Sequence, residues 1–165
     1  MVKSSAKTIA PKNQTYVSYE SPFGVLTIVS DGSAITALWL RETTVADAKK
    51  EASEITDLAA RQLDEYFAGK RRQFDIPVCP HGTDFQKAVW KELLAIPYGE
   101  TRSYKQIAQK IGNPEACRAV GMANNRNPIS IIIPCHRVIG AKGALIGYGG
   151  GLEMKQKLLD LEKPP

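Results

Sequence analysis

Apolar and β-branched residues gather in short runs along the first half of the chain, separated by polar breaks. Residues 15–19 and 25–40 are rich in Val, Ile, Leu, Thr and Tyr, and Asp31-Gly32 interrupts the longer stretch. An Asp-Gly pair between two such runs is typical of a β-hairpin. Residues 74–78 alternate with a period of two, which predicts a further strand. The first half should therefore contain a small sheet.

Between these strands the spacing of apolar residues becomes helical. From about Ala46 to Ala68 apolar side chains recur every three or four positions, and Gly69 follows as a helix-ending residue. One face of this predicted helix carries Ile55, Ala59, Leu63 and Tyr66. A sheet with one helix packed on it is a small α/β domain. Because it holds no group of catalytic side chains, we expect its role to be structural.

Residues that interrupt regular structure follow the last predicted strand. Pro77, Pro80 and Gly82 lie close together there, which indicates a linker. We therefore expect an N-terminal domain over residues 1–78 and a C-terminal domain over residues 79–165.

Two capping-box patterns open helices in the second half. Thr83 is followed three positions later by Gln86, and Ser103 by Gln106, and in both cases an apolar helical pattern comes next. The second domain should therefore be mainly helical.

A further helix is predicted directly after Gly112, with Asn113 as its N-cap and Pro114 at its first position. Together with the helix before it, this makes a helix-turn-helix, a unit found both in DNA-binding proteins and in others. Arg118 lies among small residues that would let the helix backbone approach a partner closely, or would equally suit packing against a neighbouring helix. These small residues are Ala116, Ala119, Gly121 and Ala123.

The residues around Cys135 suggest that its thiol is reactive. Residues 131–133 are a β-branched run that should be buried, and Pro134 ends it directly before Cys135. His136 can accept a proton and Arg137 adds positive charge, and both features favour the thiolate that acts as a nucleophile. The alternative is an inert core cysteine, which is the commoner fate of a cysteine beside isoleucines.

Charge and cysteine content narrow the class of protein. The net charge of +5 permits a polyanionic partner without requiring one. The chain has three cysteines, Cys79, Cys117 and Cys135, and their spacing is not that of a disulfide framework. This favours a reduced intracellular compartment over a secreted disulfide fold. We expect no membrane span, because no apolar run approaches the ~18 residues needed. The first dozen residues have no hydrophobic signal core, so we interpret them as a loose tail rather than a targeting peptide.

Cys79 and His81 are two possible zinc ligands close together in the sequence. Two ligands without a second pair leave a tetrahedral zinc site unfilled, so we expect no metal. No other motif indicates a cofactor.

The motifs of the second half together closely resemble the O6-alkylguanine-DNA alkyltransferase family. The resemblance rests on Pro-Cys-His-Arg-Val at 134–138, Asn127-Pro128 before it and Gly-Tyr-Gly-Gly-Gly at 147–151. It continues through 101–104, 117–121 and 158–162, and is strong over about residues 83–162. It implies a ribonuclease-H-like sheet-plus-helix domain followed by a helical domain with a winged helix-turn-helix, an α/β (α+β) fold.

The resemblance also implies catalytic roles. Cys135 corresponds to the alkyl acceptor and His136 to the base that takes its proton through a water. Glu162 corresponds to the carboxylate that holds this histidine, although a solvated charge at a helix end is the alternative. Asn127 corresponds to the residue that braces the segment, and Tyr104 to a tyrosine that contacts the flipped guanine and protonates the departing base.

DNA and base contacts follow from the same resemblance. Arg118 corresponds to the arginine that fills the gap left by the extruded base, on a recognition helix that enters the minor groove. The expected DNA-binding residues are Arg118, Tyr104, Cys117, Ala119 and Gly121. The carbonyls of Cys135 and Val138 correspond to those that accept the exocyclic amine. Tyr148, Gly149 and Gly150 belong to the loop that closes over the base, and a tight turn is the alternative for them.

Two residues depart from the family pattern. Gly149 stands where many members have serine, and Cys117 where alanine is commoner, so a hydroxyl contact is lost and a polarizable group is gained near DNA.

The implied function is DNA repair by one irreversible transfer of an alkyl group from O6-alkylguanine, and from O4-alkylthymine, to Cys135. We expect a monomer in the cytoplasm that acts on double-stranded DNA. A Cys-His hydrolase with turnover is one alternative, although no oxyanion-hole motif is evident. A helix-turn-helix protein that only binds DNA is the other.

Overall fold

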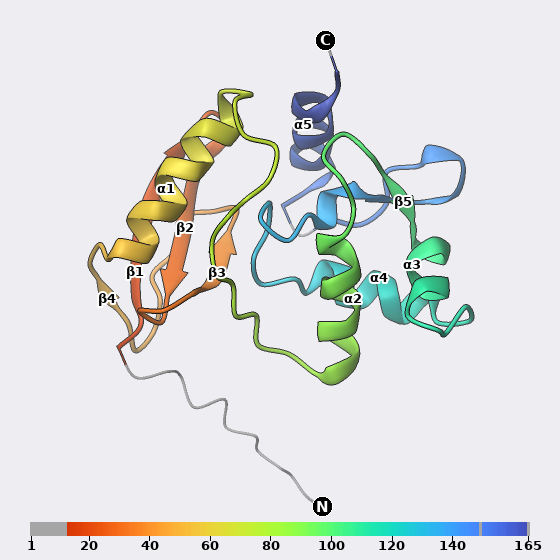
Figure 1. The fold of residues 1–165 in the computed structure, drawn as a ribbon, viewed down its shortest axis with the longest axis horizontal. Helices are drawn as coiled ribbons and strands as arrows, with labels where there is room; N and C mark the ends of the chain where they lie inside the picture. Colours follow the sequence, from red (N-terminus) through yellow and green to blue (C-terminus); the bar gives the residue numbers. More distant parts are fainter. Residues whose placement is uncertain (1–12, 149, 165) are drawn as a thin grey trace, which may run out of the picture.

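The first half of the chain forms a sheet covered by one helix in the computed structural model, which describes residues 13–148 and 150–164 (Figure 1). The strand order is β3-β2-β1-β4. β1, β2 and β3 pair antiparallel, and β4 joins the edge parallel to β1. The strands span Thr15–Ser21 (β1), Gly24–Ser30 (β2), Ile35–Trp39 (β3) and Lys49–Lys50 (β4).

The predicted hairpin at Asp31-Gly32 is confirmed. The Asp31 carboxylate accepts the backbone N–H groups of Ser33 and Ala34 at 2.8 and 2.9 Å, and Gly32 takes a left-handed φ of 97°. Aspartate and glycine meet the two demands of this turn, an acceptor for free N–H groups and a positive φ.

The predicted helix over residues 46–68 begins later than expected. α1 spans Glu54–Phe67, and Ser53 caps it by accepting from the N–H of Thr56. Lys49 and Lys50 pair with β1 instead, since the open sheet edge offers their backbone groups partners that no helix start provides. The end of the helix, with Gly69 at a positive φ, agrees with the prediction.

The predicted strand at 74–78 is wrong. Only Val78 makes a bridge, to Ile35. The backbone N–H and carbonyl of Asp75 bond instead to the side chain of Gln62, both at 2.9 Å. A side chain of α1 therefore takes the place of a neighbouring strand.

The second half consists of helices around a two-stranded pairing (Figure 1). Both capping boxes are present, at Thr83 with Gln86 and at Ser103 with Gln106. β5 and β6 pair in parallel. The elements are α2 (Asp84–Leu94), β5 (Arg102–Ser103), α3 (Tyr104–Lys110), α4 (Cys117–Asn125), β6 (Val138–Ile139) and α5 (Leu152–Glu162), with 3-10 turns η1 (Cys135–Arg137) and η2 (Ala141–Gly143).

The start of the helix predicted after Gly112 differs from the prediction. α4 begins at Cys117, and its N-cap Ala116 makes no side-chain capping bond. The Asn113 carbonyl accepts the N–H of Ala116 at 3.0 Å, so the chain makes a separate turn through Pro114 before the helix. Asn113 is used in that turn and is not a helix cap.

The two halves share one core and one backbone junction. Leu63 and Tyr66 of α1 lie in the same buried cluster as Trp90 of α2 and Ile133. At the edge of β3, the Leu38 N–H donates to the Pro128 carbonyl at 2.8 Å, and the Leu38 carbonyl accepts the Ser130 N–H at 3.1 Å. This junction fixes the segment that leads to Cys135 against the sheet. Within the described residues, the helices are too short or too polar to cross a membrane.

Candidate active site

A tight buried turn, not a strand, leads into Cys135. The predicted burial of residues 131–133 is confirmed, with exposures of 6% or less. Ile131 has a φ of 71°, a left-handed value that a β-branched residue adopts only under strain. Asn127 holds the turn, since its amide donates to the Ile133 carbonyl at 2.8 Å and its oxygen accepts the Ile129 N–H at 3.0 Å.

Cys135 begins η1 and lies against a cavity of about 470 Å³. Its side chain is buried, and burial raises the pKa of the thiol, while Asn127, Lys155 and Tyr148 act in the opposite direction. The thiol therefore needs a base to become a nucleophile at neutral pH.

His136 and Glu162 form a buried pair directly behind this cysteine. Nε2 of His136 lies 2.7 Å from Oε2 of Glu162. Burial lowers the pKa of His136 and favours a neutral ring. Burial alone would raise the pKa of Glu162, but hydrogen bonds from His136 and Arg137, together with the positive charge of Arg137, lower it to about 2. The carboxylate therefore accepts a hydrogen bond from Nε2–H, and the lone pair of Nδ1 is available to act as a base.

The Nδ1 atom of His136 is buried and has no protein hydrogen-bond partner among the described residues. Glu162 is 2% exposed, so the alternative of a solvated charge at a helix end is excluded. The structure thus brings Cys135, its neighbour His136 and the distant Glu162 together.

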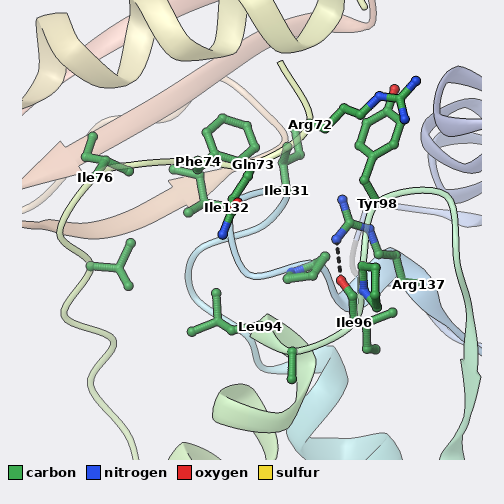
Figure 2. Close-up of a pocket in the computed structure, with 14 residues that line it drawn as sticks. Arg72, Gln73, Phe74, Ile76, Leu94, Ile96, Tyr98, Ile131, Ile132 and Arg137 are labelled. Atoms are coloured by element: carbon green, nitrogen blue, oxygen red, sulfur yellow. Dashed lines mark hydrogen bonds between the residues drawn. The ribbon is translucent and has the colours of Figure 1, made fainter.

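Arg137 acts on Glu162 and not on the thiol, contrary to the sequence expectation. Its Nε and Nη2 donate to the two carboxylate oxygens at 2.8 and 3.0 Å, and Nη1 donates to the Ile96 carbonyl at 2.7 Å. Figure 2 shows this guanidinium beside Tyr98, at the end of a separate hollow that Cys135 does not line. The carboxylate neutralises the arginine, so the positive charge expected near the thiol comes from elsewhere.

That charge comes from Lys155, which sequence reasoning missed. Lys155 is fully buried, its Nζ donates to the Ile146 carbonyl at 3.0 Å, and its charge lowers the pKa of Cys135. The ammonium also lies 5.9 and 6.0 Å from the ring centres of Tyr104 and Tyr148. A signal was present, because Lys155 shares a helical face of α5 with Leu158 and Glu162.

The expected DNA face lies on α3 and α4. Arg118 and Ala119 are exposed, whereas Cys117 and Gly121 are half-buried. Ala123, predicted as part of the same small-residue surface, is instead buried in the core.

Tyr104 connects this face to the loop before Tyr148. Its hydroxyl donates to the Ile146 carbonyl at 2.9 Å, and a Cβ at Gly121 would lie 3.9 Å from its ring. Burial raises its pKa, so the phenol keeps its proton at neutral pH.

The cavity in front of Cys135 has walls from both halves of the chain. Tyr148 and Gly150 line it as expected, Val138 is buried nearby in the core, and Gly149 lies outside the described residues. Sequence reasoning missed the walls contributed by Trp39, Leu40, Arg41, Asn124, Asn125, Arg126, Pro128 and Ser130.

Two polar atoms at this cavity have no partner among the described residues, the Tyr148 hydroxyl and Oδ1 of Asn124. The other end of the Asn124 amide donates to the Cys135 carbonyl at 3.3 Å. Asn124 and Tyr148 therefore place polar groups beside Cys135 at the wall of this cavity.

Comparison with known proteins agrees with this geometry. Residues 15–80 match the model for the ribonuclease-like domain of 6-O-methylguanine DNA methyltransferase, and residues 84–164 match the model for its DNA binding domain. A methylated-DNA–protein-cysteine methyltransferase of Methanosarcina acetivorans is 50% identical over 151 residues, covering 89% of this chain and 97% of the relative. Its Mycobacterium tuberculosis counterpart is 52% identical, covering 90% and 92%.

Among solved structures, that of Mycobacterium tuberculosis OGT in complex with DNA superimposes with a TM-score of 0.85 at 52% identity, over 90% of this chain and 92% of that one. The similarity spans both halves and includes the sheet that sequence motifs alone identify weakly. The chain therefore belongs to the 6-O-methylguanine DNA methyltransferase family.

Proposed function

We propose that this protein repairs DNA by moving a methyl or larger alkyl group from O6 of guanine onto the sulfur of Cys135. The observation that supports this most strongly is the buried series Cys135, His136 and Glu162, of which Cys135 lines a cavity. The names of the relatives, methylated-DNA–protein-cysteine methyltransferase, support the same reaction.

The chemistry is a displacement at the alkyl carbon. His136 takes the thiol proton at Nδ1 through a water, and the sulfur then attacks the carbon attached to O6. The carbon–oxygen bond breaks with its electron pair on the base, and a thioether forms on Cys135. Tyr104, which keeps its proton at neutral pH, protonates the departing guanine, and the proton held by His136 replaces the one given up by Tyr104.

The damaged nucleotide must leave the duplex to reach this sulfur, because O6 lies on the stacked base edge. Arg118 fills the vacated space from α4, where Ala119 and Gly121 let the helix backbone approach the groove, and Cys117 lies beside them. The carbonyls of Cys135 and Val138 accept the exocyclic amine of the flipped base. Tyr148, Gly149 and Gly150 close over it.

The product thioether has no route to cleavage within this site, so each molecule reacts once. The same displacement applies to O4-alkylthymine. We further propose that residues 1–78 and 79–165 are the two domains, that the protein acts as a monomer, and that it works in the cytoplasm, where its cysteines stay reduced.

The test is a reaction with a duplex that contains one O6-methylguanine, followed by intact-mass measurement and peptide mapping. We expect one added methyl group per protein molecule, on the peptide that contains Cys135. Continued turnover would favour the hydrolase, and duplex binding without a mass change would favour the protein that only binds DNA.

A further inference from the structure

The N-terminal half reaches the catalytic carboxylate through one residue. The hydroxyl of Tyr66, at the end of α1, donates to Oε2 of Glu162 at 2.6 Å. Both side chains are buried. This is the same oxygen that lies 2.7 Å from Nε2 of His136.

The ring of Tyr66 is fixed by aromatic neighbours. Phe67, Phe74 and Tyr98 lie with ring centres 5.3, 5.4 and 6.2 Å away. A phenol held on several sides directs its hydroxyl to one place, so Tyr66 presents a fixed donor to Glu162. Burial and the neighbouring carboxylate raise the pKa of Tyr66 far above its usual range, so that donor keeps its proton.

The donors around Glu162 divide its two oxygens unequally. Oε1 accepts from Nε of Arg137, whereas Oε2 accepts from Nη2 of Arg137, from Tyr66 and from His136. The fork of Arg137 fixes the plane of the carboxylate. Tyr66 contacts Oε2 from α1, so the oxygen that faces the imidazole is held by both halves of the molecule.

We propose that Tyr66 is a positioning residue of the alkyl-transfer reaction: it holds Oε2 of Glu162 against Nε2 of His136, and so keeps the tautomer in which Nδ1 is the free base. The inference rests on the proposed function, because it assigns the role of the base to His136. It gives the N-terminal half a part in the chemistry beyond the structural one that its sequence indicates.

The test compares Tyr66→Phe with Tyr19→Phe. The Tyr19 hydroxyl also donates to a carboxylate, that of Asp64 in α1 at 2.5 Å, but this pair lies within the N-terminal half and does not contact Glu162. Each variant loses one hydroxyl and keeps its ring, and a thermal melt of each variant measures its cost in stability. The rate of transfer from free O6-benzylguanine is measured, because the free base requires no flipping.

We expect Tyr66→Phe to slow this transfer by roughly three- to thirtyfold, because His136 would be held less well in the orientation that it needs as a base. Tyr19→Phe should leave the rate unchanged. A Tyr66→Phe rate equal to the wild-type rate, or above it, would overturn the proposal. Equal slowing in both variants would do so too, because it would indicate a general effect of weakened packing.

The second readout is the tautomer of His136, observed by ¹⁵N NMR of the imidazole. The chain has 2 histidines, so a His81→Gln background leaves His136 as the single signal. We expect protonated Nε2 and bare Nδ1 in the wild type, and a mixture of tautomers in Tyr66→Phe. An unchanged spectrum in Tyr66→Phe would overturn the proposal.

This spectrum requires no substrate, so it separates the two hypotheses. If the wild type formed no thioether on Cys135, the proposed function would fail, whereas the spectrum would still decide whether Tyr66 fixes the histidine.

Discussion

The two halves of the molecule contribute to the site in different ways. The second half contains the proposed nucleophile Cys135 and base His136, on a strained turn, and the carboxylate of Glu162, at a helix end. The first half supplies support, the Tyr66 hydroxyl behind the carboxylate and the cavity wall at 39–41. The difference teaches that adjacent residues such as Cys135 and His136 can be predicted from one motif, whereas a supporting group such as Tyr66 comes from a helix far away in the sequence.

The largest effect should come from removing the nucleophile in the second half. We expect Cys135→Ala to abolish alkyl transfer from both duplex and free base, because no other thiol lines the cavity. Binding to duplex DNA should remain close to wild type, since α3 and α4 are untouched. The measurements are methyl loss from a labelled oligonucleotide and a binding titration.

Cys79→Ala and Cys117→Ala are the matched controls, and both should keep most of the activity. Residual repair by Cys135→Ala, or an inactive control variant, would show that the nucleophile is misassigned.

The base and its carboxylate should come next in effect. We expect His136→Ala to slow transfer by roughly 10²- to 10⁴-fold, the usual contribution of a general base, and Glu162→Gln by less. Because burial lowers the pKa of His136 below its ordinary 6.5, the ring stays neutral in mild acid. The wild-type rate should therefore decline with acid at a midpoint below 6.5. A midpoint at or above that value would contradict the geometry proposed for the base.

Glu162→Gln should also change the dependence of stability on pH. The pKa of Glu162 falls from 4.5 to about 2 on folding, so the ionised carboxylate stabilises the folded state fully above pH 4.5. That stabilisation is lost as the pH falls through 4.5 towards 2. The variant should have a lower Tm at pH 7 because Arg137 is left buried without its partner, and the Tm difference should shrink in acid. Thermal melts across this pH range test it.

Arg118 should show an effect that depends on the substrate. It lies exposed on α4, away from the buried pair, and its proposed task exists only when the lesion is stacked in a duplex. Unstacking a base costs a few kcal/mol, so Arg118→Ala should slow duplex repair by roughly tenfold to several hundredfold. The rate with free O6-benzylguanine should hardly change. Equal losses on both substrates would mean that Arg118 supports the fold.

Much of the fold could be predicted from the sequence, because turns and helix starts depend on a few adjacent residues. The hairpin at Asp31-Gly32 and the capping boxes at Thr83 and Ser103 each depend on a few adjacent residues, and all three are present. The late start of α1 and the missing strand at 74–78 depend on partners distant in sequence. Lys49 pairs with β1 at the edge of the sheet, and the backbone N–H of Asp75 donates to the side chain of Gln62.

The same distinction holds within the site. One motif predicts Cys135 and His136 as site residues, whereas the sequence indicates Tyr66 only as one more apolar position on the buried face of a helix. Its hydroxyl contacts a residue 96 positions away, and no spacing rule reaches that far. The prediction for Arg137 was wrong because it relied on closeness in sequence. Arg137 is two positions from Cys135, but in the turn η1 its side chain points to Glu162 instead.

The smallest effect should come from the exposed wall that the first half contributes. The backbone of Arg41 is fixed, because its carbonyl accepts the buried Thr27 hydroxyl at 2.8 Å, and the residue lines the mouth of the cavity. An exposed guanidinium there would attract a phosphate beside the flipped nucleotide. Single exposed charges contribute little, so Arg41→Ala should slow duplex repair by about two- to fivefold at low salt.

The matched control is Arg61→Ala, which removes an arginine from α1 away from the cavity and should leave the duplex rate unchanged. The Arg41→Ala deficit should vanish at high salt, because salt screens exposed charges, and it should be absent with free O6-benzylguanine. A deficit that persists in salt or on the free base would mean that Arg41 shapes the cavity itself. The exposed wall of the first half would then act on the chemistry, as Tyr66 is proposed to do, and not on the approach of DNA.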